Sequence, residues 1–494
     1  MAVGGVAKVV IVGGGCSGTL LAAELSAACV DSPCEVVVVD PSERPGRGVA
    51  YGTRCSSHLL NVPAEQMSAH LERPTHFVAW ARERDPGVSE RSFAPRMLYG
   101  EYLEAVWREA QLDAAPGSSL VHIRGTVTSA ATAADDARVR VELDSGACIN
   151  ADHVVFAMGN LSPHAAAAHV HGVAASPRYI TDPWRAGALD GVRGSVLLIG
   201  TGLTAIDVAF VLADRGDVGT IRAVSRHGLL PGAHRPDARS APPLPAAPTE
   251  RTVRTLIALL RRNAAAHGDW RWAIDEFRPH VAEVWRSLPD AERRRFVRHA
   301  ARFWEIHRHR MAPEVARRVG GLLASQQLRV SAGSIAGHHD LPDGVEVSVR
   351  RRGTADTDVF TVSHVINCTG PQLSIRAARD PLIDALLTSG LVRPGPFGLG
   401  LDVTRDGAVI DALGFRSRNL WALGPLRRGV EWETTAAREI RSQAAALAVR
   451  LSRAIASVEP AQAISEAQRA LPLRMVQTAA PGGAPLDVQR AGAL

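Results

Sequence analysis

Two stretches of the chain repeat the same order of apolar and glycine-rich segments. In the first stretch these are the strand-like run 8–12, the loop Gly13-Gly-Gly15-Cys-Ser-Gly18 and the apolar helical segment 19–28. In the second stretch they are the run 195–199, the loop Gly200-Thr-Gly202-Leu-Thr-Ala205 and the helical segment 206–214. Continuous apolar runs of this length are typical of parallel strands buried on both faces. The pattern predicts two strand–turn–helix units.

Both copies continue in the same way. Each has a second strand, an alternating segment with a turn, and an apolar strand that runs into a glycine. The segments are 35–40, 138–150 and 153–160 in the first copy and 220–225, 344–362 and 364–371 in the second. A single glycine motif is weak evidence, but this repeated order predicts an α/β fold with two Rossmann-like dinucleotide-binding domains.

The second domain is interrupted by a segment of helical period. A Pro/Ala-rich linker from 235 precedes helical patterns around 250–264, 269–287 and 290–325, and we expect a helical lid there. An Ala-rich helix is predicted near 434–456, with Glu433-Thr434-Thr435 as its capped start. We divide the chain into a first domain (1–165 and 371–475), a second domain (166–234 and 326–370), the insertion (235–325) and a flexible tail (476–494).

The first loop has the residues that a bound dinucleotide needs. Gly13 makes the tight turn, Gly15 lets the backbone approach a pyrophosphate, and Gly18 lets the helix pack on the strand. Asp40 ends the second strand about 20 residues further on, where a carboxylate accepts hydrogen bonds from a ribose. A tight turn without a ligand is the alternative, which the strand, helix and acid together disfavour.

The second loop differs at two positions. Ala205 replaces the third glycine, and Ser225-Arg226 stand where the first domain has its acid. Arginine suits a 2′-phosphate, which favours NADPH over NADH, although a solvated surface arginine is also compatible with the pattern.

Composition limits the class of protein. Hydrophobic residues make up 46% and charged residues 21%, as in an ordinary globular protein. The net charge of +6 comes without a basic block or tail, so it fits anionic small molecules and gives nucleic acid no support. No apolar run approaches the roughly 20 residues of a membrane span, and the N-terminus lacks the basic region of a signal peptide. The six cysteines are too sparse for a disulfide framework, so we expect the protein to reside in the reducing cytoplasm.

Five further segments are more specific than the glycine loops: 46–52, 58–67, 93–103, 304–311 and 423–435. Together they resemble a bacterial family of FAD/NAD(P)-binding proteins that includes a flavin-dependent urate hydroxylase and a nitrosuccinate-forming aspartate N-monooxygenase. The resemblance covers about 8–450, with the insertion included.

Candidate site residues are of three kinds, of which the resemblance implies the FAD residues and the loop and charge patterns indicate the others. For FAD they are Gly13, Gly15, Ser17, Gly18, Asp40, Gly48, Tyr51, Leu60, Asn61, Met67, Val127, Gly159, Gly424, Pro425, Thr434 and Thr435. For NADPH or NADH they are Gly200, Gly202, Leu203, Thr204, Ser225 and Arg226. For an anionic substrate they are His58, Arg96, His307 and Arg310, where a solvated helix face is the alternative for the last two. Pro425 replaces the acid of many two-dinucleotide flavoproteins, which puts the usual ribityl contact in doubt.

Other chemistry has little support. Cys29 and Cys34 have the spacing of a redox pair but stand at the wrong end of the first domain to reach a flavin ring. No CxxC, HExxH or GxSxG motif is present, so neither a metal site nor a serine nucleophile is expected. No side chain can be chosen as catalytic acid or base.

The family resemblance implies an FAD-dependent monooxygenase. NAD(P)H would reduce the flavin, and a C4a-hydroperoxide formed with O2 would hydroxylate a small polar, anionic or nitrogen-containing substrate, urate-like or an amino acid. One alternative is an NAD(P)H-dependent reductase or dehydrogenase without oxygen insertion, and a second is a non-catalytic flavin-binding sensor. The expected partners are the substrate and O2, without nucleic acid or membrane, and a homodimer stays open.

Overall fold

The computed structural model of the chain describes residues 6–30, 32–132, 138–163, 172–235 and 246–469. Its first half is built on a six-stranded sheet in the order β15-β16-β7-β1-β2-β3, parallel except where β15 meets β16. These strands are β1 (Ala7–Val12), β2 (Cys34–Asp40), β3 (Ser119–Arg124), β7 (His153–Phe156), β15 (Ala408–Ile410) and β16 (Arg416–Ala422). The sheet therefore joins segments from both ends of the described chain.

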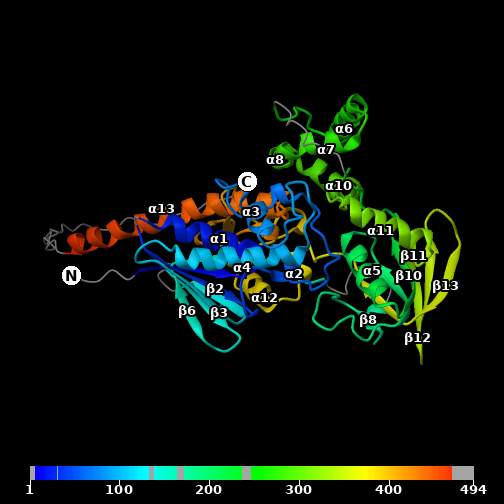
Figure 1. Cartoon of the computed structure of the whole chain (residues 1–494). Helices are drawn as coiled ribbons and strands as arrows, with labels where there is room; N and C mark the ends of the chain where they lie inside the picture. The colour runs from blue at the N-terminus through cyan, green and yellow to red at the C-terminus, as the bar shows by residue number, and fades with distance from the viewer. Residues whose placement is uncertain (1–5, 31, 133–137, 164–171, 236–245, 470–494) are drawn as a thin grey trace, which may run out of the picture.

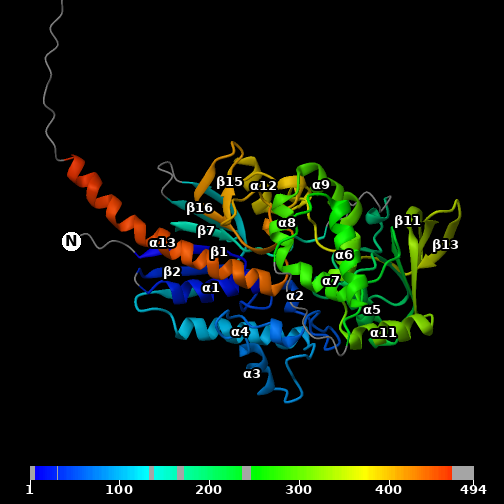
Figure 2. The same cartoon turned by 90° about the horizontal axis from the view of Figure 1, so that it is seen from above.

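Both faces of this sheet are covered, which explains why β1 and β2 are apolar at nearly every position. Helices α1 (Cys16–Ala28), α4 (Arg96–Leu112) and α13 (Ala437–Arg469) lie on one face (Figures 1 and 2). The other face carries helix α12 (Pro381–Thr388) and a separate antiparallel sheet of β4 (Val127–Thr132), β5 (Val139–Leu143) and β6 (Cys148–Ala151). Short helices α2 (Gly48–Tyr51) and α3 (His76–Arg82) lie between β2 and α4 in the chain and pack on the same face as α4.

A seven-stranded sheet in the order β13-β12-β11-β10-β9-β14-β8 forms the second half. Its strands are β8 (Tyr179–Ile180), β9 (Gly194–Ile199), β10 (Val218–Ser225), β11 (Leu328–Leu341), β12 (Gly344–Arg351), β13 (Thr357–Val362) and β14 (His364–Asn367). Helix α5 (Leu203–Arg215) follows β9 and packs on β9 and β10 through Val208 and Leu212. The predicted α/β fold with two repeated units is thus confirmed.

The two alternating segments end in different places. Segment 138–150 forms β5 and β6, which stand outside the main sheet, whereas 344–362 forms β12 and β13 within it. The difference comes from β11, which the alternating pattern does not predict. β11 pairs parallel with β10 over Leu328–Ala332 and then antiparallel with β12 from Gly333 on, so one long strand ties the hairpin to the sheet.

The predicted helical insertion is present. Helix α11 (Pro313–Ala324) falls within the predicted bounds 235–325 but packs into the apolar core of the second half, so the insertion ends earlier than predicted. The insertion itself contains α6 (Val253–His267), α7 (Trp270–Phe277), α8 (Val281–Ser287), α9 (Asp290–Arg295), a π-helical turn (Phe296–Ala300) and α10 (Ala301–Arg308). Its apolar core takes in Leu399 and Trp432, which belong to the segment that returns to the first sheet. The insertion therefore stands at the junction of the two halves (Figure 1). Residues 236–245 of the predicted linker and the tail 476–494 lie outside the described residues.

The C-terminal helix starts later than predicted. α13 begins at Ala437, and Thr434 is not its cap, because the Thr434 hydroxyl donates to the carbonyl of Gly424 at 2.7 Å. The capped start at Glu433–Thr435 is therefore wrong: the helix begins at Ala437, and the Thr434 oxygen accepts from the side-chain amide of Gln443 at 2.9 Å instead of from the first helix amides. None of the described helices is long and apolar enough to span a membrane.

Candidate functional site

The first glycine loop is closed by packing against its own neighbours. A Cβ at Gly13, where φ is +103°, would lie 2.7 Å from the carbonyl oxygen of Ala157, and a Cβ at Gly18 only 1.8 Å from that of Gly13. Both glycines are therefore required by the fold. Asp40 completes the loop from the end of β2, since its carboxylate accepts from the Gly14 amide at 2.6 Å.

The middle glycines of the two loops are different. At Gly15 (φ −70°) an added Cβ would meet nothing closer than Gly48 at 3.4 Å, and at Gly202 (φ −84°) nothing closer than Arg302 at 3.8 Å. Any residue adopts these backbone angles, so the fold itself has room for a side chain at both positions. Glycine there suits a ligand that approaches the backbone closely.

Each loop also leads into a helix whose first amides lack a side-chain cap. Neither α1, which follows Gly15, nor α5, which follows Gly202, receives a cap hydrogen bond, and neither has an acidic residue in its first turn. Free N–H groups and the helix dipole make such an end a site for phosphate. Both loops therefore fit a dinucleotide pyrophosphate.

The second loop is surrounded by cations. Arg226 is exposed directly after β10, and Asp40 of the first unit occupies the corresponding place at the end of β2. Beside it, Arg352 donates to the Arg226 carbonyl at 3.3 Å and contacts the ring of His227. Arg302 reaches the same loop from the insertion and donates to the Leu229 carbonyl at 2.8 Å. Only Arg226 was predicted; no sequence signal marks the others, because they arrive from distant elements.

Hydrogen bonds of Ser225 and Thr201 hold this loop in place. Thr201 is buried, and its hydroxyl lies 2.9 Å from that of Ser225 and donates to the Leu229 carbonyl at 2.6 Å. Leu203 and Thr204 form the first turn of α5. These predicted residues are therefore brought together around Gly202.

The predicted flavin-side residues gather near the first loop in two groups. Gly48 faces Gly15, and Tyr51 follows on the same short helix α2, with its ring 4.6 Å from that of Tyr99. Gly424, with φ +71°, would place a Cβ 2.8 Å from the hydroxyl of Ser17. The C-terminal segment therefore does reach the first loop.

Other predicted residues lie around this centre. Gly159 and Pro425 line one small cavity of about 20 Å³. Leu60, Met67 and Val127 are buried, the first two in the core under α4 and Val127 in the core on the opposite face of the sheet. The backbone carbonyl of Asn61 accepts from His234, and Thr435 stands two residues before α13.

Two substrate candidates form a joint between the halves instead of standing free. Arg96, at the start of α4, pairs with the buried Asp207 of α5 at 2.6 Å. His58 is buried and donates from Nε2 to the Asp207 carbonyl at 3.0 Å, while Thr53 bonds its Nδ1 at 2.8 Å. Burial alone would lower the pKa of His58, but the neighbouring Cys55 thiol and Asp207 raise it overall.

The two candidates on the insertion are also engaged. His307 bonds the Phe303 carbonyl from Nδ1 and packs edge-on against Trp270, with ring centroids 4.6 Å apart. Arg310 is buried and pairs with Asp275 at 2.5 Å. All four substrate candidates thus have intramolecular partners, and their role toward a substrate stays a prediction.

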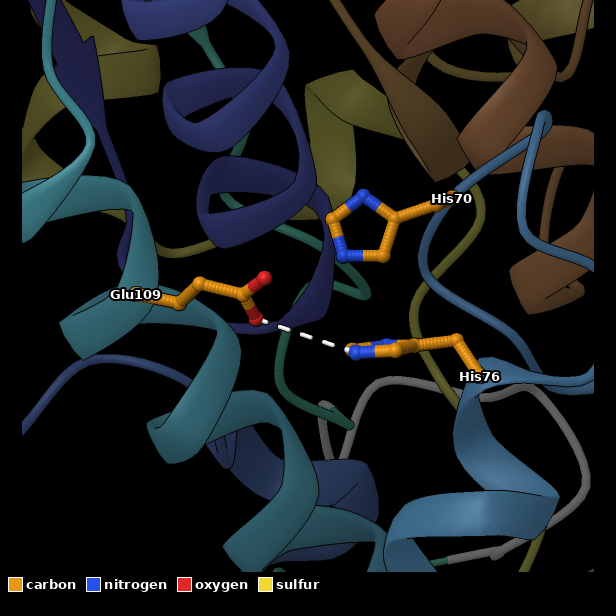
Figure 3. A group of neighbouring side chains, drawn as sticks. All are labelled: His70, His76 and Glu109. Atoms are coloured by element: carbon orange, nitrogen blue, oxygen red, sulfur yellow. Dashed lines mark ion pairs between the residues drawn. The ribbon is translucent and has the colours of Figure 1, made fainter.

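A cluster of possible ligand atoms lies at helix α4 (Figure 3). His70, His76 and Glu109 each offer an atom within 4.8 Å of the others. Arg73 stands among them, 2.9 Å from His70 Nε2 and 3.0 Å from a carboxylate oxygen of Glu109. A guanidinium therefore already neutralises the carboxylate and occupies one imidazole, so we assign no metal to this group.

The cysteine pair lies far from the loop. Cys29 and Cys34 are buried with their sulfur atoms 2.8 Å apart, at the start of β2. Asp40, which contacts the loop, ends the same strand, about 20 Å away for a strand of this length. The pair has no path to the flavin side of the site.

Comparison with known proteins agrees with this geometry. Residues 10–161, about a third of the chain, match the FAD-NAD(P)-binding family. The resemblance to FAD/NAD(P)-binding proteins and the expected cofactors, FAD and NAD(P)H, are thereby confirmed.

Individual relatives are similar over different lengths. Nitrosuccinic acid synthase of Aspergillus oryzae is 31% identical over 173 residues, which are 31% of this chain and 26% of that protein. The chain therefore matches only about a quarter of that curated relative. Ornithine hydroxylase from Pseudomonas aeruginosa (TM-score 0.63, 91% of this chain and 100% of the other) and L-lysine 6-monooxygenase from Pseudomonas syringae (0.61, 91% and 99%) are each 16% identical. At that identity they show a shared fold.

Proposed function

We propose that the protein is an FAD-dependent, NADPH-consuming monooxygenase that hydroxylates a small amino acid or amine. The open positions at Gly15 and Gly202, each before an uncapped helix, carry this function, because they provide two separate dinucleotide sites in one chain. When bound, FAD supplies the redox chemistry with NADPH and dioxygen.

The first loop holds the adenine half of FAD in this proposal. The free amides at the start of α1 bind the pyrophosphate, and Asp40 accepts from a ribose hydroxyl while it holds the Gly14 amide. Ser17 and Gly424 meet at the same point, so the C-terminal segment closes the site from the opposite side.

The second loop holds NADPH. Its amides at the start of α5 face the pyrophosphate, and the exposed Arg226 is placed for the 2′-phosphate. The helical insertion covers the junction, because its core is continuous with Leu399 and Trp432 of the first half. A covered junction excludes water from the reacting groups.

The substrate class is proposed from the relatives. The names of the relatives point to amino-acid chemistry. Ornithine hydroxylase and L-lysine 6-monooxygenase are named for amino-acid substrates, and nitrosuccinic acid synthase is named for its product. Arginines at the insertion, such as Arg302 and Arg428, suit the carboxylate group of an amino acid. Urate, the other class of substrate in the predicted family, stays a prediction.

The function is tested with purified, FAD-loaded protein. NADPH oxidation and oxygen uptake are measured with aspartate, ornithine, lysine, cadaverine and urate, and products are sought by mass spectrometry under ¹⁸O2. We expect one amino acid or amine to stimulate oxidation and to gain one labelled oxygen. Flavin reduction by NADPH without a labelled product from any of them would indicate a reductase instead.

A further inference from the structure

Helix α10 of the insertion reaches the second glycine loop through one arginine. Arg302 donates from Nη2 to the Leu229 carbonyl at 2.8 Å and to the Thr201 hydroxyl at 3.3 Å. Its other terminal nitrogen, Nη1, lies 3.8 Å from the position that a Cβ on Gly202 would take. The guanidinium therefore faces the open side of the loop, where a pyrophosphate would lie.

The charge of Arg302 has no acidic counterpart in contact. Within the part of the chain that the structure describes, no carboxylate is recorded within ion-pair distance of Arg302, and both of its hydrogen-bond acceptors are neutral oxygens. Among the described residues, the acid that acts on Arg302 electrostatically is Glu305, and it is paired with Arg428 at 2.9 Å. A half-buried guanidinium with free donors beside an uncapped helix N-terminus is a site for an anion.

The opposite side of α10 contacts the segment that closes the first loop. Trp304 donates from its indole nitrogen to buried Glu433 at 2.9 Å, and Arg308 pairs with the other carboxylate oxygen at 3.1 Å. The next residue, Thr434, bonds the carbonyl of Gly424, which in turn lies against Ser17 of the first loop. One short helix thus touches the surroundings of both dinucleotide sites.

The start of α10 has a feature that suits a movable element. Residues Phe296–Ala300 form a π-helical turn immediately before it. π-Helical turns are rare in proteins, and those that occur are frequently found at functional sites.

We propose that Arg302 binds the pyrophosphate of NADP(H) on the second loop and thereby fixes helix α10 with Trp304 and Arg308 against Glu433. The identity of the dinucleotide rests on the proposed function. Arg226, at the end of β10, is assigned the 2′-phosphate instead, so the two arginines serve different groups of one ligand. Occupancy of the second site is in this way communicated to the closure of the first.

The first experiment compares two ligands by equilibrium binding at one salt concentration. NADP⁺ carries both phosphate groups, whereas 2′-AMP carries only the 2′-phosphate. Loss of a charge-assisted hydrogen bond from Arg302→Gln should weaken NADP⁺ binding about 10- to 100-fold and leave 2′-AMP binding within about twofold. Arg226→Gln should weaken both ligands, and Arg302→Lys should restore part of the affinity for NADP⁺.

Arg298→Gln provides the matched control. Arg298 is exposed on the π-helical turn about one turn before Arg302, and none of the described hydrogen bonds joins it to the second loop, so this variant removes the same charge without removing a loop contact. It should bind both ligands like the parent protein. Unchanged NADP⁺ binding by Arg302→Gln, or equal weakening of NADP⁺ and 2′-AMP, would overturn the assignment.

The second experiment tests the communication by amide hydrogen exchange of residues 296–308. NADP⁺ should slow exchange there in the parent protein and in Arg298→Gln, and this slowing should be lost in Arg302→Gln at saturating NADP⁺. Equal slowing in Arg302→Gln would show that α10 is not held through this side chain.

These readouts are independent of oxygen chemistry. If Arg302→Gln loses NADP⁺ affinity but no substrate is hydroxylated, the inference stands and the monooxygenase proposal fails. If hydroxylation occurs while Arg302→Gln binds NADP⁺ normally, the monooxygenase proposal stands and the inference about Arg302 fails. A parent protein that does not bind NADP⁺ would overturn both.

Discussion

At the scale of single residues, His234 shows how burial between the two halves changes the pKa of a titratable group. Its Nε2–H donates to the carbonyl of Asn61 at 3.0 Å, which fixes the neutral tautomer next to a predicted flavin-side segment. Burial, reinforced by the charge of Arg310, lowers the pKa of His234 to about 3. The folded protein therefore holds this imidazole neutral well below the pH at which a free histidine would protonate.

This gives stability a definite pH dependence. A histidine in the unfolded chain has a pKa of about 6.5. Between pH 6.5 and 3 the unfolded chain therefore binds more protons than the folded protein, and the free energy of unfolding falls as pH is lowered. His234 accounts for about 1.5 kcal/mol of the loss between pH 6.5 and 5. His234→Gln should reduce the measured loss in urea unfolding by that amount.

His339→Gln is the control, because His339 is exposed. It should leave the difference in unfolding free energy between pH 6.5 and 5 unchanged. An unaltered difference in His234→Gln would show that another group sets the acid sensitivity.

At the scale of elements, the glycine loops separate what the fold needs from what a ligand needs. Gly18 has no space for a Cβ, and neither has Gly200, whose Cβ would lie 2.2 Å from the Cys368 carbonyl at φ +120°. Gly15 and Gly202 have that space, so the fold accepts a Cβ at both positions, and only the proposed dinucleotides would exclude it.

We therefore expect Gly15→Ala and Gly202→Ala to fold normally and to lose one ligand each. Gly15→Ala should be purified with little FAD, whereas Gly202→Ala should keep its flavin spectrum and bind NADP⁺ at least about tenfold more weakly. Circular dichroism checks the fold, visible absorption the FAD content, and titration the NADP⁺ affinity. An unfolded Gly202→Ala protein would contradict this division.

At the scale of the whole molecule, the two halves are joined at a buried ion pair. Arg96 on α4 and Asp207 on α5 are 2.6 Å apart, and the side chain of Asp207 is only 8% exposed. Because Asp207 lies in the helix that follows the second loop and His58 donates to its carbonyl, this joint helps to set the second glycine loop relative to the first half.

Removal of either partner should leave an uncompensated charge. Arg96→Met and Asp207→Asn should each lower the free energy of unfolding by about 3 kcal/mol, and the double variant should lose clearly less than the sum. Urea unfolding of the four proteins gives the coupling. Arg351→Met, which breaks an exposed pair with Asp358, should leave the midpoint unchanged; additive losses in the double variant would show that no coupling exists.

The same scale shows what can be predicted for the site. The glycine loops, Asp40 and Arg226 are found because each lies within one strand–turn–helix unit, where local spacing fixes geometry. Arg302, Arg352 and the Thr434–Gly424 hydrogen bond join elements far apart along the chain. No sequence motif in the insertion indicates which loop its arginines contact. The predicted helix start at Glu433 is wrong because a long-range contact also decides where Thr434 bonds.

The sequence by itself determined the repeated α/β units and the loops that fit two dinucleotides, because apolar period and glycine spacing act over short segments. The division between protein-packed and ligand-facing glycines needed the tertiary structure, since only coordinates show what a Cβ would meet. The structure likewise placed α10 between Gly202 and Glu433 and engaged His58 and Arg96 in a joint. Such contacts depend on how the insertion packs, which no local pattern specifies.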